Sequence, residues 1–239
     1  MAQEAGLNGP EHDLAGGGAG QSAEVAAAKA RVLTAALPNA PFDGWSEQTL
    51  RAAIEASGVE PGLARMAFPR GAVDLALAFH DDGDARLAQA LATAPLAGMR
   101  MRERVAFAVR TRLELVERHR EAVRRGATLF ALPIYAADGA KALWRTADVI
   151  WTGLGDTSDD ANWYSKRAIL SGVYGSTVLY WLGDGSEGFA DTWAFLDRRI
   201  DGVMQFEKLK AQVNANPLGR VALAVPNALS KLVRPPRRA

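Results

Sequence analysis

The sequence has no cysteine and only three histidines, His12, His80 and His119, among its 239 residues. The absence of cysteine excludes disulfide bonds and thiolate chemistry. Three histidines scattered along the chain do not supply a nucleophile paired with a base. We therefore expect no catalytic residues, no metal site and no cofactor.

Long apolar runs and an excess of one charge are missing as well. No segment approaches the roughly 20 consecutive apolar residues that span a bilayer, and the formal net charge is +1. A charge so close to zero gives no bulk attraction to nucleic acid or to a membrane, so either would need a local patch. Residues 1–22 contain neither a basic start nor an apolar stretch. We expect them to form a disordered tail rather than a secretory or transit peptide.

Patterns typical of β-strands are scarce, and apolar residues recur instead at helical spacing. We predict an all-α fold. The predicted helices are 23–37, 46–57, 61–67, 71–80, 84–97, 99–125, 138–153, 160–182, 188–214 and 217–233. The predicted domains are a helix-turn-helix-like subdomain over 23–83, a helical subdomain over 84–215, and an amphipathic helix with a basic tail over 216–239.

The segment from 32 to 80 has the pattern of a helix-turn-helix. An apolar-periodic helix starts near Thr49, Gly58-Val59 supplies a turn, and a short second helix starts at Pro61-Gly62-Leu63. Phe68-Pro69 closes that second helix. The pattern resembles the helix-turn-helix of TetR-type transcription repressors, whose recognition helix lies in the major groove of DNA.

The charge of this segment argues against DNA binding. Between Ala40 and Asp84 there are three basic and eight acidic residues, so the local net charge is −5. A protein that reads a DNA groove needs a basic footprint against the phosphates. We therefore expect a TetR-like fold that no longer binds nucleic acid. The alternative is a TetR-type ligand-responsive transcription regulator.

The run His80-Asp81-Asp82-Gly83-Asp84 contains side chains that ligate metals. Asp and Gly are also common in turns and helix caps. We interpret the run as the connection between two helices and not as a metal site.

Aromatic residues are concentrated in the second half of the chain. Five of the six tryptophans lie between Trp144 and Trp193, around the run 160–167, and that stretch contains no His or Cys. Aromatic and Arg side chains supply much of the energy of protein contacts and line apolar pockets. The combination favours recognition over catalysis.

The helix predicted over 160–182 sorts its residues onto different faces, because each residue turns the helix by about 100°. One face carries Trp163, Arg167, Leu170, Tyr174, Val178 and Trp181. Another carries the small residues Ala168, Ser171, Gly172, Gly175 and Ser176, where a lipid chain or a neighbouring helix can come close. We interpret Leu170, Tyr174 and Val178 mainly as core. Trp163 and Tyr164 stand among charged residues, which is more typical of a surface patch.

A short amphipathic helix is predicted near the end of the chain. Basic residues lie opposite its apolar face, and Arg237-Arg238 follow it. This pattern is typical of a helix in a membrane interface, and the same face also suits packing on the protein body or on a second copy. The apolar face consists of Leu218, Val221, Ala222, Val225, Leu229, Leu232 and Val233.

Three runs in the second half are specific in sequence. They are Asp148-Val149-Ile150-Trp151, residues 158–170 with Asn162-Trp163-Tyr164 inside, and residues 189–200 with Asp191-Thr192-Trp193 inside. Together they resemble the Coq-nine family of ubiquinone (coenzyme Q) biosynthesis lipid-binding proteins, over about residues 27–211. That family has a TetR-like fold, which agrees with the helix-turn-helix pattern.

The resemblance implies a non-enzymatic accessory protein and not an enzyme. Such a protein forms a homodimer, holds an isoprenoid, quinone or phospholipid in its helical subdomain, and presents precursors to the di-iron hydroxylase of the pathway. The implied partner-binding patch is Asp160, Trp163, Tyr164 and Arg167. We expect lipid contacts from Leu170, Gly172, Tyr174, Gly175, Val178 and Trp181.

The resemblance also implies a place at the membrane. The family is credited with a terminal helix that docks on it, so we expect Leu218, Val221, Val225, Leu229 and Leu232 to face the lipid. Since no transit peptide is visible, we expect a bacterial cytoplasmic protein that is peripheral on the inner face of the cytoplasmic membrane.

Overall fold

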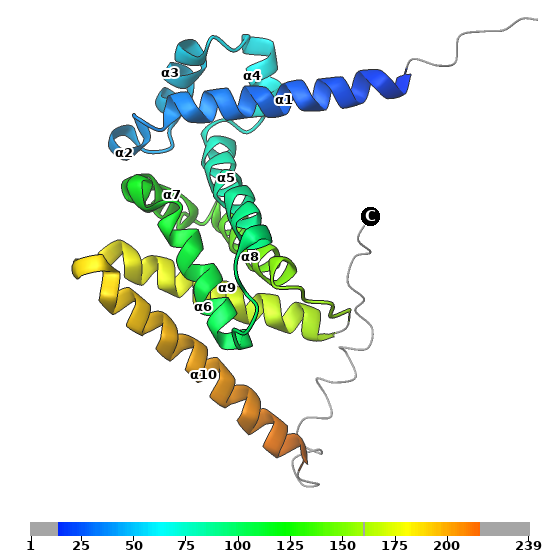
Figure 1. Ribbon diagram of the computed structural model, residues 1–239. Helices are drawn as coiled ribbons and strands as arrows, with labels where there is room; N and C mark the ends of the chain where they lie inside the picture. Colours follow the sequence, from blue (N-terminus) through cyan, green and yellow to red (C-terminus); the bar gives the residue numbers. More distant parts are fainter. Residues whose placement is uncertain (1–13, 160, 216–239) are drawn as a thin grey trace, which may run out of the picture. The chain divides into compact units, whose positions relative to one another are not determined.

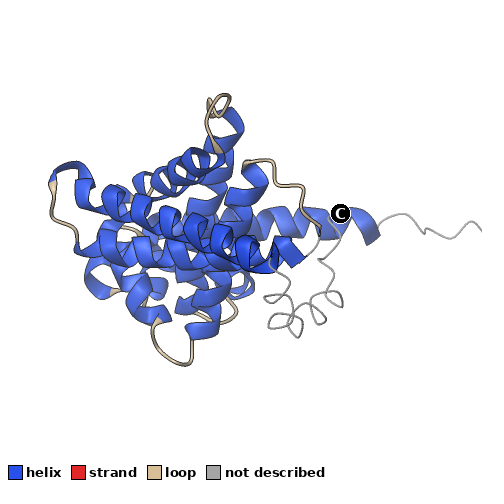
Figure 2. Ribbon diagram, turned by 90° about the horizontal axis from the view of Figure 1, so that it is seen from below, coloured by secondary structure: helices blue, strands red, loops and turns tan. Residues whose placement is uncertain are grey.

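The computed structural model describes residues 14–159 and 161–215, and every regular element in those ranges is a helix (Figures 1 and 2). The described chain divides into two compact units, which meet in sequence between Phe79 and His80. The predicted all-α fold is confirmed. The predicted membrane helix, with Leu218, Val221, Val225, Leu229 and Leu232, lies outside the described residues, as does Asp160 of the predicted patch.

The first unit contains α1 (Leu14–Ala36), α2 (Ala40–Asp43), α3 (Glu47–Ser57), α4 (Pro61–Ala67) and the beginning of α5 (Ala72–Thr93). α1 packs on both α3 and α4 (Figure 1). Val32, Ala36 and Ala53 are fully buried in this core. α1 begins at Leu14, within the segment 1–22 that was predicted to be a disordered tail. The prediction was wrong for residues 14–22. The alanine and glycine residues of this segment do not by themselves indicate a helix, and the helix continues into the segment from the packed part of α1.

α3 and α4 form the predicted helix-turn-helix. Ser46 caps α3 by accepting a hydrogen bond from the Thr49 backbone N–H at 3.2 Å. Gly58 ends α3 in the left-handed conformation with φ of 61°, which glycine adopts without a Cβ clash. Glu60 then caps α4, and Pro61 occupies its first turn. The local signals at each helix end therefore suffice to place this motif.

The second unit contains the rest of α5, α6 (Met101–Glu114), the 3₁₀ turn η1 (Glu117–His119) and α7 (Arg120–Phe130). It continues with α8 (Ala136–Gly153), α9 (Ala161–Gly183), the 3₁₀ turn η2 (Glu187–Phe189) and α10 (Ala190–Ala215). α9 packs between α8 and α10, and α10 also contacts α6. None of the helices in the described ranges is long and apolar enough to cross a membrane.

α5 is continuous where the sequence predicted two helices separated at Gly83. Gly83 lies inside this helix, where a Cβ would stand 2.5 Å from the guanidinium carbon of Arg112, so glycine leaves room for that side chain. Asp84, one residue later, pairs with Arg112 Nε at 2.8 Å and with Thr146 Oγ1 at 2.9 Å. The run from His80 to Asp84 is thus helical and not a connection, with Gly83 and Asp84 buried and with Asp81 and Asp82 exposed. Burial lowers the pKa of His80 to about 4.

The single long helix predicted over 99–125 is instead divided into α6 and α7. Val116 leaves the helical conformation, with φ of −112° and ψ of 6°, and its side chain is buried. The Leu115 carbonyl oxygen accepts a hydrogen bond from Arg86 at 2.7 Å in place of one within a helix. The break turns α7 so that it packs against α8.

Candidate functional site

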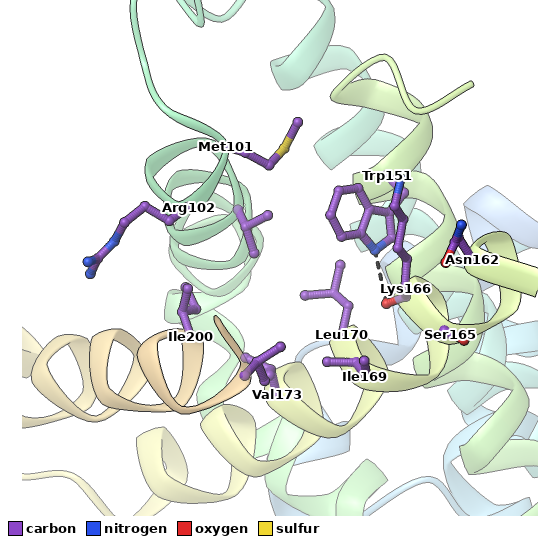
Figure 3. Close-up of a pocket in the computed structure, with 12 residues that line it drawn as sticks. Met101, Arg102, Trp151, Asn162, Ser165, Lys166, Ile169, Leu170, Val173 and Ile200 are labelled. Atoms are coloured by element: carbon purple, nitrogen blue, oxygen red, sulfur yellow. Dashed lines mark hydrogen bonds between the residues drawn. The ribbon is translucent and has the colours of Figure 1, made fainter. Parts of the chain in front are cut away.

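An apolar cavity of about 250 Å³ lies between α6, α8, α9 and α10 in the second unit (Figure 3). Its deep side is made by Leu170 and Val173, which are 3% and 6% exposed. Its polar lining residues stand at the outer side, where Arg102 and Lys166 are more than a third exposed. The lining residues are Met101, Arg102, Val105, Trp151, Asn162, Ser165, Lys166, Ile169, Leu170, Val173, Ile200 and Val203.

The polar groups around this cavity are already satisfied by protein atoms. Trp151 donates from Nε1 to the Lys166 carbonyl oxygen at 3.1 Å, so its ring is left as an apolar wall (Figure 3). Arg102 pairs with Asp201 at 2.8 Å. A hollow with apolar walls and a few charged groups on one side suits a ligand with an apolar chain and a polar end.

Next to the cavity, α9 carries a completely buried arginine. Arg167 Nε donates to Asp148 Oδ1 at 2.6 Å, and Nη1 donates to Asp156 Oδ2 at 3.1 Å. Nη1 also donates to the Trp163 carbonyl oxygen, and the guanidinium carbon stands 4.0 Å from the centre of the Trp163 ring. A buried cation is tolerated only with such paired carboxylates. The arginine therefore holds Trp163 in place from the buried side of its ring.

Asp156, in the connection between α8 and α9, binds two cations at once. Its Oδ1 accepts from Lys166 Nζ and from Ser158 Oγ, each at 2.7 Å, while Oδ2 accepts from Arg167. Burial alone raises the pKa of Asp156, but the hydrogen bonds from Lys166, Ser158 and Arg167 outweigh it and lower the pKa to about 2. The carboxylate is therefore ionised at any physiological pH.

Three aromatic side chains gather beside Arg167, and we call Trp144, Trp163 and Tyr164 the aromatic patch. The Trp163 and Tyr164 rings meet edge to face with 4.8 Å between centroids. Trp144, on α8, stands 5.9 Å from Trp163 and 6.2 Å from Tyr164. All three are half-buried. A rigid aromatic surface of this kind is common at the centre of protein interfaces.

The structure separates the residues of the predicted partner-binding patch. Trp163 and Tyr164 reach the surface together, as expected. Arg167 does not, because its pairing with Asp148 and Asp156 takes it fully out of solvent. Arg167 is therefore not a surface contact, and the predicted patch is corrected at this residue. Asp160 lies outside the described residues.

The six residues predicted to contact lipid are dispersed, and only Leu170 lines the cavity. Tyr174 is buried near Arg112 and Asp84, and burial raises its pKa. Trp181 is 1% exposed and packs against Phe189 with Arg120 over its ring. The other three, Gly172, Gly175 and Val178, are not among the lining residues.

The small face of α9 is divided between two surroundings. A Cβ on Gly175 would come within 3.1 Å of Leu143, so this glycine lets α8 and α9 approach each other. A Cβ on Gly172 would meet no atom within 4 Å, and Gly172 is exposed. The neighbouring helix foreseen for this face is therefore α8, at Gly175.

Sequence reasoning missed most of the cavity wall, including Trp151, Ile169, Val173 and Ile200. Ile169 and Val173 are one turn apart, with Lys166 nearly a turn before them, so helical spacing does mark this face. Periodicity cannot tell a face that meets solid core from one that meets a hollow. Asp148 belongs to a sequence run that was singled out and Asp156 does not, and nothing in the local sequence of either residue indicates that they share an arginine.

Residues 136–207 match the COQ9 family model. The chain is 33% identical over 192 residues to "Ubiquinone biosynthesis protein COQ9, mitochondrial" from Rattus norvegicus, which is 77% of this chain and 61% of that protein. The chain contains a COQ9 domain. The same-named proteins from Drosophila melanogaster and Homo sapiens are 32% and 31% identical, over 85% and 77% of this chain and over 62% and 60% of their own lengths.

The chain thus spans about three fifths of the length of the curated COQ9 relatives that it matches. The COQ9 domain contains α8, the connection with Asp156, α9 and most of α10. It therefore includes the aromatic patch and most of the cavity wall, whereas the α6 residues of the wall precede it. The names of these relatives call them mitochondrial, and the predicted bacterial cytoplasm stays a prediction.

The fold is also that of a solved structure. A TetR transcriptional regulator from Nitrosomonas europaea aligns with a TM-score of 0.57 and 18% sequence identity, over 72% of this chain and 95% of that chain. The TetR-like fold predicted for this chain is confirmed.

Proposed function

We propose that this protein is a non-enzymatic accessory protein of ubiquinone biosynthesis. It binds an isoprenoid, quinone or phospholipid in the cavity and presents a ubiquinone precursor to a hydroxylase of the pathway. The observation that carries the proposal is an apolar cavity bordered largely by the COQ9 domain. The relatives with that domain are named ubiquinone biosynthesis proteins, which supports the choice of ligand and pathway.

The aromatic patch is the proposed contact for the hydroxylase, which we take to be of the di-iron type. Trp163 and Tyr164 are half-buried and rigidly packed, so they bury further area against a partner at little entropic cost. Trp163 and Tyr164 stand on the same turns of α9 as the cavity residues Asn162, Ser165 and Lys166. A precursor held in the cavity is therefore close to the proposed partner.

A homodimer through α9 and α10 is a further part of the proposal. Leu179 is 66% exposed, and Tyr180, 39% exposed, stacks on Phe195 of α10 with 4.5 Å between the ring centroids. Such an apolar surface fits a second copy, because a two-fold axis would pair it with itself. Sedimentation velocity is the direct test of the homodimer, and a monomer at micromolar concentration contradicts this part of the proposal.

A membrane contact through residues 218–232 is also part of the proposal. Flotation of the protein with anionic vesicles tests it, and protein that stays unbound to the vesicles contradicts it.

A larger side chain inside the cavity tests the main proposal. Val173→Phe places a ring in the hollow, so we expect the affinity for decylubiquinone, a short-chain quinone, to fall about tenfold or more, which is 1.4 kcal/mol. Quenching of tryptophan fluorescence measures the binding. Ile134→Phe is the matched control, since it adds the same ring at a residue that is 76% exposed and does not line the cavity. Equal affinity in both variants, with the fold intact, refutes the cavity as the ligand site.

The second candidate is a ligand-responsive transcription regulator, which the likeness to the TetR regulator favours. The charge of the first unit weighs against it. The carboxylate of Glu60 occupies the amino end of α4, where hydrogen bonds from the backbone N–H groups of Gly62 and Leu63, the latter at 2.9 Å, lower its pKa. A negative charge at the start of the recognition helix repels DNA phosphates. Salt-dependent binding to duplex DNA would restore this candidate, and its absence removes it.

A further inference from the structure

Asp156 divides its two carboxylate oxygens between the two parts of the site. Oδ1 binds Lys166, whose side chain lines the cavity, and Oδ2 binds Arg167, which lies under Trp163. Lys166 and Arg167 are adjacent on α9, so they leave the helix about 100° apart. Their shared anion is the direct electrostatic link between the cavity and the aromatic patch.

Of the two cations, Lys166 is the one that can move. It is 38% exposed, its Nζ stands 5.3 Å from the centre of the Trp151 ring, and its ammonium is a flexible point charge. Arg167 is fully buried and held by Asp148 as well as Asp156. A ligand in the cavity that carries a hydrogen-bond acceptor would therefore compete with Asp156 for Lys166 but not for Arg167.

Arg167 has an unused donor with which to respond. Its Nη2 is buried and has no hydrogen-bond partner in the described part of the chain. A buried unsatisfied N–H is costly, so a small movement of the Asp156 carboxylate toward it is favoured once Lys166 has left. Because the guanidinium lies 4.0 Å from the Trp163 ring centre, such a movement changes the surroundings of that ring.

We infer that Asp156 is a positioning residue that reports occupation of the cavity to the aromatic patch. A ligand whose head accepts a hydrogen bond from Lys166 leaves Oδ1 of Asp156 bonded to Ser158 alone, so the carboxylate turns toward Arg167 and Trp163 is repositioned. This inference rests on the proposed function, since it requires a ligand in the cavity. It gives the patch a means to distinguish the loaded protein from the empty one.

Two tryptophans allow the two events to be followed separately. Trp151 lines the cavity and reports occupation, whereas Trp163 is not among the lining residues and reports the patch. The experiment is ¹⁹F NMR of the full-length protein labelled with 5-fluorotryptophan, with each resonance assigned by a Trp→Phe replacement. The probes are decylubiquinone and n-decylbenzene, which has the same chain but no hydrogen-bond acceptor.

We expect decylubiquinone to move both resonances and n-decylbenzene to move only that of Trp151. In Lys166→Met the Trp163 response to decylubiquinone is lost, while the Trp151 response remains. The control is Arg102→Met, which removes the other cavity cation; Arg102 pairs with Asp201 and not with Asp156, so the Trp163 response is kept. Asp156→Asn should behave as Lys166→Met does. If the Asp156→Asn protein does not fold, Lys166→Met carries the test.

The other outcomes separate this inference from the proposed function. If decylubiquinone moves Trp151 without Trp163, the cavity binds its ligand and the coupling is refuted. A Trp163 response that persists in Lys166→Met, or that n-decylbenzene also produces, refutes the role of the Asp156 pair. If neither resonance moves, the proposed ligand class fails, and the coupling fails with it.

Discussion

Arg167 shows how one buried charge organises the residues around it. An unpaired guanidinium would not be stable in this interior, so Asp148 and Asp156 are drawn to it from α8 and from the α8–α9 connection. The helical wheel correctly placed Arg167 and Trp163 on one face. It could not show that Arg167 is buried, because its carboxylate partners are 11 and 19 residues away in sequence.

Trp163 is the residue at which the proposed partner contact can be tested most simply. Trp163→Ala removes the ring that meets Tyr164 edge to face and lies against Arg167. We therefore expect affinity for the hydroxylase to fall by about 2 kcal/mol or more, as at the centre of other interfaces. Surface plasmon resonance with the purified hydroxylase measures this.

Phe42→Ala is the matched control, since Phe42 is an aromatic residue that is 80% exposed in the other unit. Unchanged affinity in a folded Trp163→Ala protein would remove the aromatic patch from the proposal.

At the scale of elements, helix ends decide what could be predicted. α3 and α4 were located closely, because Ser46, Gly58 and Pro61 are local signals. α5 and the α6–α7 break were not, because tertiary contacts decide them. Gly83 gives Arg112 room to pack against a continuous α5, and the hydrogen bond from Arg86 to the Leu115 carbonyl oxygen accompanies the end of α6. Neither contact can be inferred from the sequence of a single helix, because each joins two helices.

The carboxyl end of α9 gives an element-scale prediction. Arg120, on α7, donates to the carbonyl oxygens of Trp181 and Asp184 at the end of α9, and lies over the Trp181 ring. Arg120→Met removes these charge-assisted bonds, so we expect the free energy of unfolding to fall by about 2 kcal/mol. Urea denaturation followed by circular dichroism measures the change.

Arg125→Met is the control on the same helix. Arg125 is 46% exposed and pairs with Glu121 at the surface, so its loss should cost about 0.5 kcal/mol or less. Equal losses in the two variants would show that Arg120 does not fasten the end of α9.

At the scale of the whole molecule, helical periodicity was enough for the fold class, and the resemblance located the family. The cavity was not predictable in the same way. It is a space left where α6, α8, α9 and α10 fail to fill one another, and it depends on residues about 100 positions apart, such as Met101 and Ile200. A single sequence specifies which faces are apolar, but the volume between them arises only from the packed helices.

The central claim is that the cavity holds a lipid. The most direct measurement is mass spectrometry of the native protein and of its organic extract, for the wild type and for Val173→Phe prepared in parallel. We predict isoprenoid quinone or phospholipid in near-stoichiometric amount in the wild type and a marked loss of it in Val173→Phe. A wild-type protein free of lipid, or equal lipid in both proteins, would contradict the account.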